Sequence, residues 1–213
     1  MDTSLNFSQI FDSLIELHKN YCLIHRRNIS YDKYKVLEEL GLLESQKIAV
    51  DQPIISESLL EHVGNLPMVA TFLYPYLEQK ERIDLGRVLT MLAIHDIGET
   101  VVGDEHPYMK TSEHKESEYQ AAKSLLSESY YYLLDEYEAR ETLDAKYAKA
   151  VDVFSTFLSD QLHSPIMVQT RLKMHGFSWQ EIEEKRYGIF EWDLFLRELF
   201  LEVVRRYKTI ESK

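Results

Sequence analysis

The sequence has few of the residues that build disulfide-rich or turn-rich proteins. Its single cysteine, Cys22, excludes an intramolecular disulfide and a cysteine cage for zinc. Only 7 glycines and 5 prolines occur in 213 residues, which argues against a turn-rich β architecture and favours helices. The sequence also lacks a run of about 18 apolar residues, so we expect no membrane span and no membrane partner.

Basic residues are scarce as well, with 24 Lys and Arg against 36 Asp and Glu, a net charge of −12. Such a surface repels polyphosphate backbones, so we expect no nucleic-acid partner. A small phosphorylated substrate stays compatible, because a bound divalent cation reverses the potential locally. The first residues are acidic where a signal peptide needs basic ones, and we therefore expect a cytoplasmic protein.

Apolar residues recur at three- and four-residue spacing through most of the chain, which predicts amphipathic helices. The segments expected to be helical are 5–24, 31–40, 59–77, 85–100, 112–127, 145–158, a helix starting at Ser164-Pro165, and a long final helix opened by a capping box at Ser178. Residues 44–56 have no clear period and should form a loop. The sequence thus predicts an all-α protein, with an N-terminal helical extension over 1–50 packed on a core over 51–213.

The string HDIGETVVGD, residues 95–104, directly follows the apolar run MLAI. Neutral imidazole and carboxylate are ligands of divalent ions, and neighbouring helix residues point only about 100° apart, so His95 and Asp96 can reach one ion. Glu99 should lie on the same side of that helix. His106 and His114 follow, but surface roles are expected for both. The string therefore predicts part of a metal site.

Two residues elsewhere strengthen this interpretation, since a single His-Asp doublet is more often a helix end than a ligand pair. His62 follows an acidic residue upstream, and Asp152 is the one charged residue on an otherwise apolar face. Two His and two Asp from three helices form a plausible nitrogen and oxygen site for one divalent ion, with open positions for water and substrate. Such a set suits Mn, Co, Fe and Ni better than Mg or Zn.

The pattern resembles the HD-domain phosphohydrolases, which are named for the His-Asp doublet that supplies two of their metal ligands. Their fold is a helical bundle, here with extra N- and C-terminal helices. The resemblance extends over about residues 56–158, including the segments HKESEYQAAKSLL and LLDEYEARETLDAKYAKAVD. It implies that the metal ligands are His62, His95, Asp96 and Asp152.

The spacing of Glu and Gly-Asp after the doublet resembles the 5′-deoxynucleotidase branch of that family. The resemblance implies that Glu99 and Asp104 are catalytic, that Lys110 binds the substrate phosphate, and that the protein is a homodimer. Glu118 lies on a nearby helix but is expected to be solvated. The implied activity is removal of the 5′-phosphate from (deoxy)nucleoside monophosphates. The alternatives are hydrolysis of another nucleotide or a phosphodiester, and a non-catalytic HD scaffold that binds a nucleotide.

Overall fold

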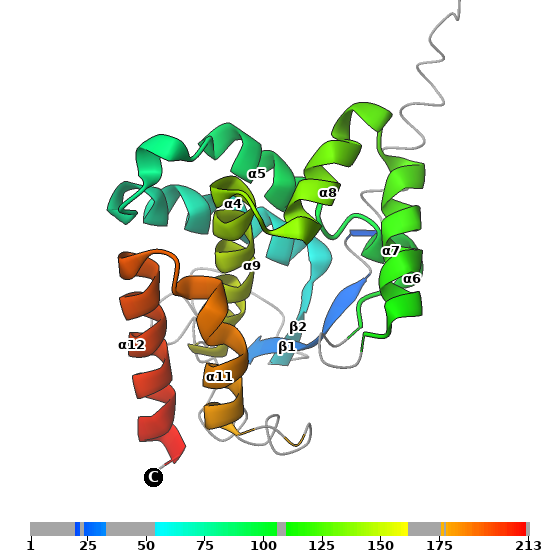
Figure 1. The fold of residues 1–213 in the computed structure, drawn as a ribbon. Helices are drawn as coiled ribbons and strands as arrows, with labels where there is room; N and C mark the ends of the chain where they lie inside the picture. Colours follow the sequence, from blue (N-terminus) through cyan, green and yellow to red (C-terminus); the bar gives the residue numbers. More distant parts are fainter. Residues whose placement is uncertain are drawn as a thin grey trace, which may run out of the picture.

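The computed structural model describes residues 20–21, 24–32, 54–105, 110–161, 176 and 178–211. Within these ranges, no helix combines the length and the apolar composition that a membrane span requires. The elements follow one another along the chain in Figure 1 as β1 (His25–Asp32), β2 (Ile54–Ser58), α4 (Leu59–Leu73), α5 (Leu85–Ile94), α6 (Glu99–Val102), α7 (Ser112–Leu125), α8 (Tyr131–Ala139), α9 (Leu143–Gln161), α11 (Trp179–Phe190) and α12 (Leu194–Glu211). Short 3-10 turns occupy Tyr74–Tyr76, Lys80–Arg82 and Glu128–Tyr130.

The predicted all-α class is confirmed, and the helices expected over 59–77, 112–127 and 145–158 appear as α4, α7 and α9. A small antiparallel ribbon was not predicted: β1 pairs with β2, with Tyr31 opposite Ile55. Pairing between strands distant in sequence leaves no trace in a local helical period, which explains the omission.

The ribbon corrects two boundaries near the N-terminus. Residues from Ile54 onward form β2, so the loop predicted over 44–56 is wrong at its end. Tyr31 and Asp32 belong to β1, so the helix predicted over 31–40 is wrong at its start. Asn20 and Tyr21 are helical, in keeping with the helix predicted over 5–24. Ile24, the last residue of the first of these predictions, is not helical. The other residues of the two predicted helices, and the start expected at Ser164-Pro165, lie outside the described residues.

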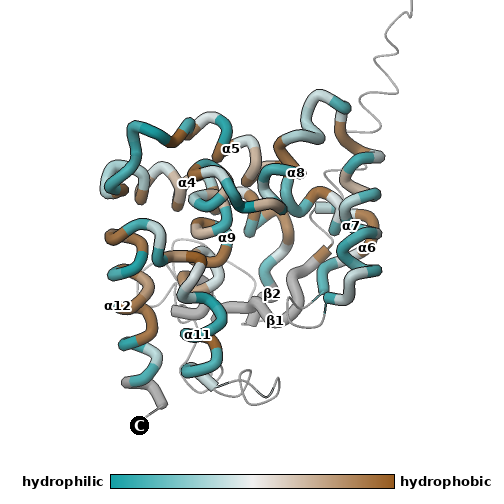
Figure 2. The backbone as a smooth tube through the Cα atoms, viewed as in Figure 1, coloured by the Kyte–Doolittle hydropathy of each residue, from teal (hydrophilic) through white to brown (hydrophobic). Residues whose placement is uncertain are grey.

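Helix α9 runs through the middle of the molecule and contacts α4, α5, α8, α11 and α12 (Figure 1). Its inward residues Tyr147, Ala148 and Val151 are fully buried. The Tyr147 hydroxyl donates to the backbone oxygen of Ala70 at 2.5 Å, which ties α9 to α4. Hydrophilic and hydrophobic residues alternate along α12, as expected for a helix with one face on the core (Figure 2). The position of Asp152 is therefore set by the most extensively packed helix.

The long final helix predicted from Ser178 is two helices. The capping box at Ser178 is confirmed, with its hydroxyl accepting from the Glu181 amide at 3.2 Å. The first helix ends at Phe190, and the buried Asp193 caps the start of the second. Its Oδ1 accepts from the Leu196 amide at 3.2 Å, and its Oδ2 accepts from the Glu78 amide at 2.9 Å. The spacing of apolar residues does not show that a polar side chain between them caps a new helix, so the break was not predicted.

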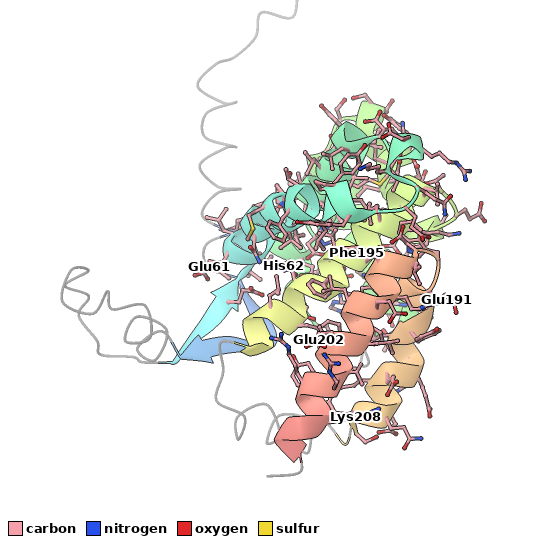
Figure 3. All side chains as sticks on the ribbon, turned by 90° about the vertical axis from the view of Figure 1, so that its left-hand side faces the viewer. Glu61, His62, Glu191, Phe195, Glu202 and Lys208 are labelled. Carbon is pink, nitrogen blue, oxygen red and sulfur yellow. The ribbon has the colours of Figure 1, made fainter. Side chains whose placement is uncertain are left out.

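The two final helices are joined where the start of α11 lies beside the end of α12. The rings of Trp179 and Tyr207 stack with centroids 3.6 Å apart, and Lys208 pairs with Glu183 at 2.7 Å. Figure 3 shows Glu202 and Lys208 along α12, while His62 lies on the other side of the helical body, near the β2–α4 junction. The α11–α12 pair therefore supports α9 from the side away from His62.

A second, smaller apolar cluster lies beside the His-Asp doublet. It consists of buried residues from separate parts of the chain, Tyr21, Leu59, Ile97, Ala122 and Leu134. Next to it, the turn that contains Gly98 packs directly on α7. A Cβ atom added at Gly98 would lie 2.1 Å from the backbone oxygen of Glu118, far inside van der Waals contact. This position therefore requires glycine for close approach.

Gly98→Ala should destabilise the protein by about 1–3 kcal/mol, because the added methyl group collides with rigid backbone. Gly64→Ala is the matched control, since nothing lies within 4 Å of the Cβ position there. The free energy of unfolding of that control should rise by about 0.5–1 kcal/mol, because alanine loses less backbone entropy than glycine when it folds into a helix. Urea unfolding followed by circular dichroism measures both, and equal stability of Gly98→Ala and the parent would refute the tight contact.

Candidate metal centre

His62 is positioned by the start of α4. Ser58 and Glu61 form a capping box, in which the Ser58 hydroxyl accepts from the Glu61 amide and the Glu61 carboxylate accepts from the Ser58 amide at 2.8 Å. This fixes the first turn of the helix, and His62 is the residue directly after Glu61. The imidazole is fully buried, and its Nε2 lies 3.2 Å from Oδ1 of Asp152.

The His-Asp doublet lies immediately after α5 and not within a continuous helix. The helix predicted over 85–100 ends at Ile94, and α6 starts at Glu99. Between them the amides of Ile97, Glu99 and Thr100 donate three residues back, which tightens the chain into turns. The single-helix prediction was wrong here because the close packing at Gly98 is a tertiary constraint.

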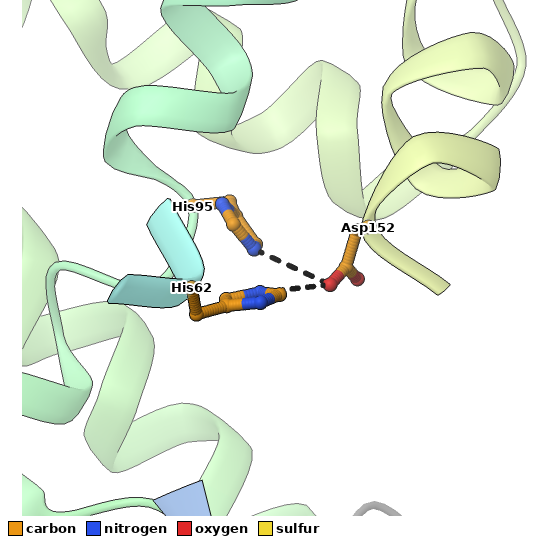
Figure 4. A group of neighbouring side chains, drawn as sticks. All are labelled: His62, His95 and Asp152. Atoms are coloured by element: carbon orange, nitrogen blue, oxygen red, sulfur yellow. Dashed lines mark ion pairs between the residues drawn. The ribbon is translucent and has the colours of Figure 1, made fainter. Parts of the chain in front are cut away.

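Four side-chain atoms converge where α4, α5 and α9 meet. His95 Nε2 lies 3.1 Å from Asp96 Oδ2 and 3.7 Å from Asp152 Oδ1. His62 Nε2 lies 3.5 Å from Asp96 Oδ2. Figure 4 shows both imidazoles directed at the same oxygen of Asp152. The ligand atoms of His62, His95 and Asp152 all lie within 4.8 Å of one another, which is close enough to surround one ion.

The opposite nitrogens of both imidazoles already have partners. His95 Nδ1 lies 3.0 Å from the backbone oxygen of Leu92, which can only accept a hydrogen bond. His62 Nδ1 lies 3.3 Å from Oγ of Ser155. Because the Ser155 hydroxyl donates its hydrogen to the Asp152 backbone oxygen, it is left to accept from His62. Both rings are therefore held with the lone pair of Nε2 toward the centre, the tautomer that binds a metal.

The donor set fits a divalent ion. The Nε2 atom of His95 is buried and makes no hydrogen bond within the described residues. The fully buried His62 directs its Nε2 at Asp96 and Asp152, 3.5 Å and 3.2 Å away. Leaving a buried nitrogen such as His95 Nε2 unsatisfied is costly unless another group occupies the space between the imidazoles and the carboxylates. Two imidazole nitrogens and two carboxylate oxygens are ligands that first-row divalent ions accept.

The electrostatics of the centre couple ion binding to protons. Burial alone would lower the pKa of His95, but the Asp96 and Asp152 carboxylates outweigh it and raise the pKa to about 10. Burial would raise the pKa of Asp96, and the adjacent His95 instead lowers it below its usual range. The four groups therefore favour a positive charge between them. Since metal ligation requires neutral imidazoles, a bound ion would take the place of protons.

Glu99, predicted to be catalytic, is buried beside this centre. Its Oε1 accepts from Lys110 at 2.6 Å, while its Oε2 has no hydrogen-bond partner among the described residues. Burial and the nearby Asp96 raise the pKa of Glu99 well above its usual value, and Lys110 opposes this only in part. Lys110, predicted to bind phosphate, also pairs with Glu118 at 2.7 Å.

Glu118 is not solvated as the sequence analysis expected. It was expected to be solvated, but its side chain is only 17% exposed and contacts both Lys110 and His114. His114 Nε2 lies 2.9 Å from Glu118 Oε1, so this histidine contacts the acidic network and not the four converging atoms. His106 lies outside the described residues.

A cavity of about 700 Å³ opens beside the centre. Six of the seven predicted site residues line it, and the fully buried His62 does not. Those six are His95, Asp96, Glu99, Asp104, Lys110 and Asp152. The structure therefore brings together side chains that span residues 95 to 152 at the wall of one cavity large enough for a small substrate.

Tyr137 and Lys149 also line the cavity, although the sequence analysis did not single them out. Both donate to Oδ2 of Asp152, from Tyr137 at 2.9 Å and from Lys149 at 2.7 Å. Lys149 precedes Asp152 by three residues, so their shared helix face was a usable signal. Tyr137 carried no such signal, because it comes from α8.

The comparisons with known proteins agree with this geometry. The family model described as HD domain matches residues 46–185, a range that includes all seven predicted site residues. The 5′-deoxynucleotidase HDDC2 of Dictyostelium discoideum is 27% identical over 165 residues, which cover 68% of this chain and 80% of that protein.

Solved structures share the fold. A predicted metal-dependent phosphohydrolase from Magnetospirillum magnetotacticum superposes with a TM-score of 0.67 at 24% identity, covering 96% of each chain. A conserved hypothetical protein from Pyrococcus furiosus gives a TM-score of 0.53 at 23% identity, covering 92% of this chain and 99% of that one. The resemblance predicted from the His-Asp doublet is confirmed: this chain belongs to the HD-domain family.

Proposed function

We propose that this HD-domain metal-dependent phosphohydrolase removes the 5′-phosphate from (deoxy)nucleoside monophosphates. The observation that carries the proposal is the convergence of two buried imidazole nitrogens and two carboxylate oxygens at the wall of a cavity. The substrate class is supported by the similarity to the Dictyostelium 5′-deoxynucleotidase. In this proposal the ligands of the ion are His62, His95, Asp96 and Asp152.

The bound ion would supply Lewis acidity and neutralise charge on the phosphoryl group. The nitrogen and oxygen donor set favours Mn, Fe, Co or Ni over Mg or Zn. The protein holds these donors ready, because the Nδ1 contacts of both imidazoles and the Oδ2 contacts of Asp152 fix their orientation. A site fixed before the substrate arrives requires little rearrangement during the reaction.

Glu99 is proposed to accept the proton of the attacking water. Its Oε2 atom has no hydrogen-bond partner in the described part of the chain and is available for this contact, while Lys110 holds the other oxygen in place. A raised pKa makes the carboxylate a stronger proton acceptor, which is the direction that suits a general base. Lys110 therefore orients Glu99 in addition to its proposed contact with the phosphate.

Asp104 lines the same cavity and stands close enough to Glu99 to raise the pKa of that carboxyl further. Two roles are compatible with this place. Asp104 delivers a proton to the leaving oxygen, or it holds the ribose end of the substrate.

With Mn²⁺ or Co²⁺ present, deoxynucleoside 5′-monophosphates should release phosphate faster than 3′-monophosphates, nucleoside diphosphates or cyclic dinucleotides. A phosphate-release assay across this panel makes the measurement, with Asp152→Asn as the control for contaminating phosphatase. Release from diphosphates alone, or opening of phosphodiesters alone, would favour the other HD hydrolase activities. The absence of turnover on every substrate would favour a non-catalytic nucleotide-binding scaffold.

Glu99→Gln should lower turnover by about 10²–10⁴, because glutamine keeps the size of the side chain but cannot accept the proton. Metal content should stay at the parent value, since Glu99 is not one of the four converging groups. Elemental analysis and steady-state kinetics on the same preparation test both statements. Glu113→Gln, on the exposed first turn of α7, serves as the control.

Unchanged turnover in Glu99→Gln would mean that Glu99 only ends the turn after the doublet. Loss of metal together with turnover would instead make Glu99 a ligand or the support of one. Either result would remove the general-base role from the proposal.

A further inference from the structure

The two oxygens of Asp152 have different surroundings. Oδ1 faces the imidazoles, 3.2 Å from His62 Nε2 and 3.7 Å from His95 Nε2. Oδ2 faces the opposite way and accepts from the Lys149 ammonium at 2.7 Å and from the Tyr137 hydroxyl at 2.9 Å. The carboxylate is therefore divided into one oxygen that points to the centre and one that is held by other side chains.

These contacts restrict how the carboxylate can bind an ion. A carboxylate without other partners can rotate and offer either oxygen, or both at once, to a metal. Here rotation would break two hydrogen bonds in a buried place, because the Asp152 side chain is only 9% exposed. Breaking buried hydrogen bonds to a charged group is costly. Asp152 is thereby restricted to a single donor atom.

Lys149 and Tyr137 reach Asp152 from different helices and also contact each other. Lys149 lies one turn before Asp152 on α9, and its Nζ lies 3.3 Å from the Tyr137 hydroxyl and 5.4 Å from the Tyr137 ring centroid. The Tyr137 ring in turn packs against His95, with centroids 5.0 Å apart. Lys149 therefore contacts Asp152 directly, and it contacts Tyr137, which packs against His95, another candidate ligand.

We propose that Lys149 is a positioning residue of the metal centre, which together with Tyr137 holds Asp152 Oδ2 so that only Oδ1 is offered to the ion. This inference rests on the metal centre of the proposed function but not on the identity of the substrate. The ammonium also balances one of the two carboxylate charges beside the ion. Lys149 lines the cavity, and its side chain is mostly buried, at 19% exposed.

The alternative is that Lys149 forms an ordinary ion pair along a helix. Such a pair three residues apart contributes only a few tenths of a kcal/mol to stability and nothing to ligand geometry. The two roles differ in what the loss of the ammonium changes. If Lys149 positions Asp152, loss of the ammonium lowers metal affinity more than stability. If Lys149 only forms a helix pair, its loss lowers stability slightly and leaves metal affinity unchanged.

The test is titration of the metal-free full-length protein with Mn²⁺ in the absence of substrate, followed by calorimetry. Lys149→Met should weaken Mn²⁺ binding by about 10–100-fold, the usual effect of removing a partner that orients a ligand. Lys149→Arg keeps the charge and should recover most of the affinity. Tyr137→Phe removes the other donor to Oδ2 and should also weaken binding. Lys146→Met, the same substitution one turn earlier on α9, should bind Mn²⁺ as the parent does.

Thermal unfolding of each metal-free variant separates positioning from loss of fold. Parent-like Mn²⁺ affinity in a folded Lys149→Met protein would overturn the inference, and so would equal weakening in Lys149→Met and Lys146→Met. If the parent binds Mn²⁺ but does not cleave 5′-monophosphates, the proposed function fails while the Mn²⁺ affinities still decide the role of Lys149.

Discussion

The arrangement of the centre depends on one constraint: buried imidazole nitrogens and carboxylate oxygens must have partners of opposite charge. His62 Nε2 and His95 Nε2 are buried, and the carboxylates of Asp96 and Asp152 lie 3.1–3.7 Å from them. Desolvated groups of this kind persist only where their charges are compensated. A divalent ion would satisfy all four at once, and the surrounding contacts hold the two imidazoles and Asp152 in the orientation that such an ion requires.

The helical framework serves this constraint by fixing each donor from a different direction. A capping box begins the helix of His62, packing at Gly98 shapes the turn of the doublet, and the buried face of α9 carries Asp152. Glu99, Lys110 and Glu118 then form an acidic and basic chain along the cavity wall. The same interior therefore contains a proposed ion site and a proposed proton acceptor, held apart by their separate hydrogen-bond partners.

Much of this could be predicted from the sequence, because helical periodicity and the chemistry of ligands are local properties. The all-α class and α4, α7 and α9 follow from spacing. The side chains that gather at the centre were predicted from ligand chemistry and from the resemblance to the HD-domain family. The ribbon of β1 and β2, the break after Ile94 and the cap at Asp193 depend on contacts between distant segments. Tyr137 was missed for the same reason. The homodimer, the cytoplasmic location and the division of the chain at residue 50 stay predictions.

The central claim is that one divalent ion binds at His62 Nε2, His95 Nε2, Asp96 Oδ2 and Asp152 Oδ1. Anomalous X-ray diffraction at the manganese edge, from crystals grown with Mn²⁺, locates the ion directly. The account predicts one strong anomalous peak per chain, within about 2.0–2.3 Å of those four atoms, the range typical of such ligands. A peak at another position, or a peak that leaves either buried imidazole uncoordinated, would contradict it.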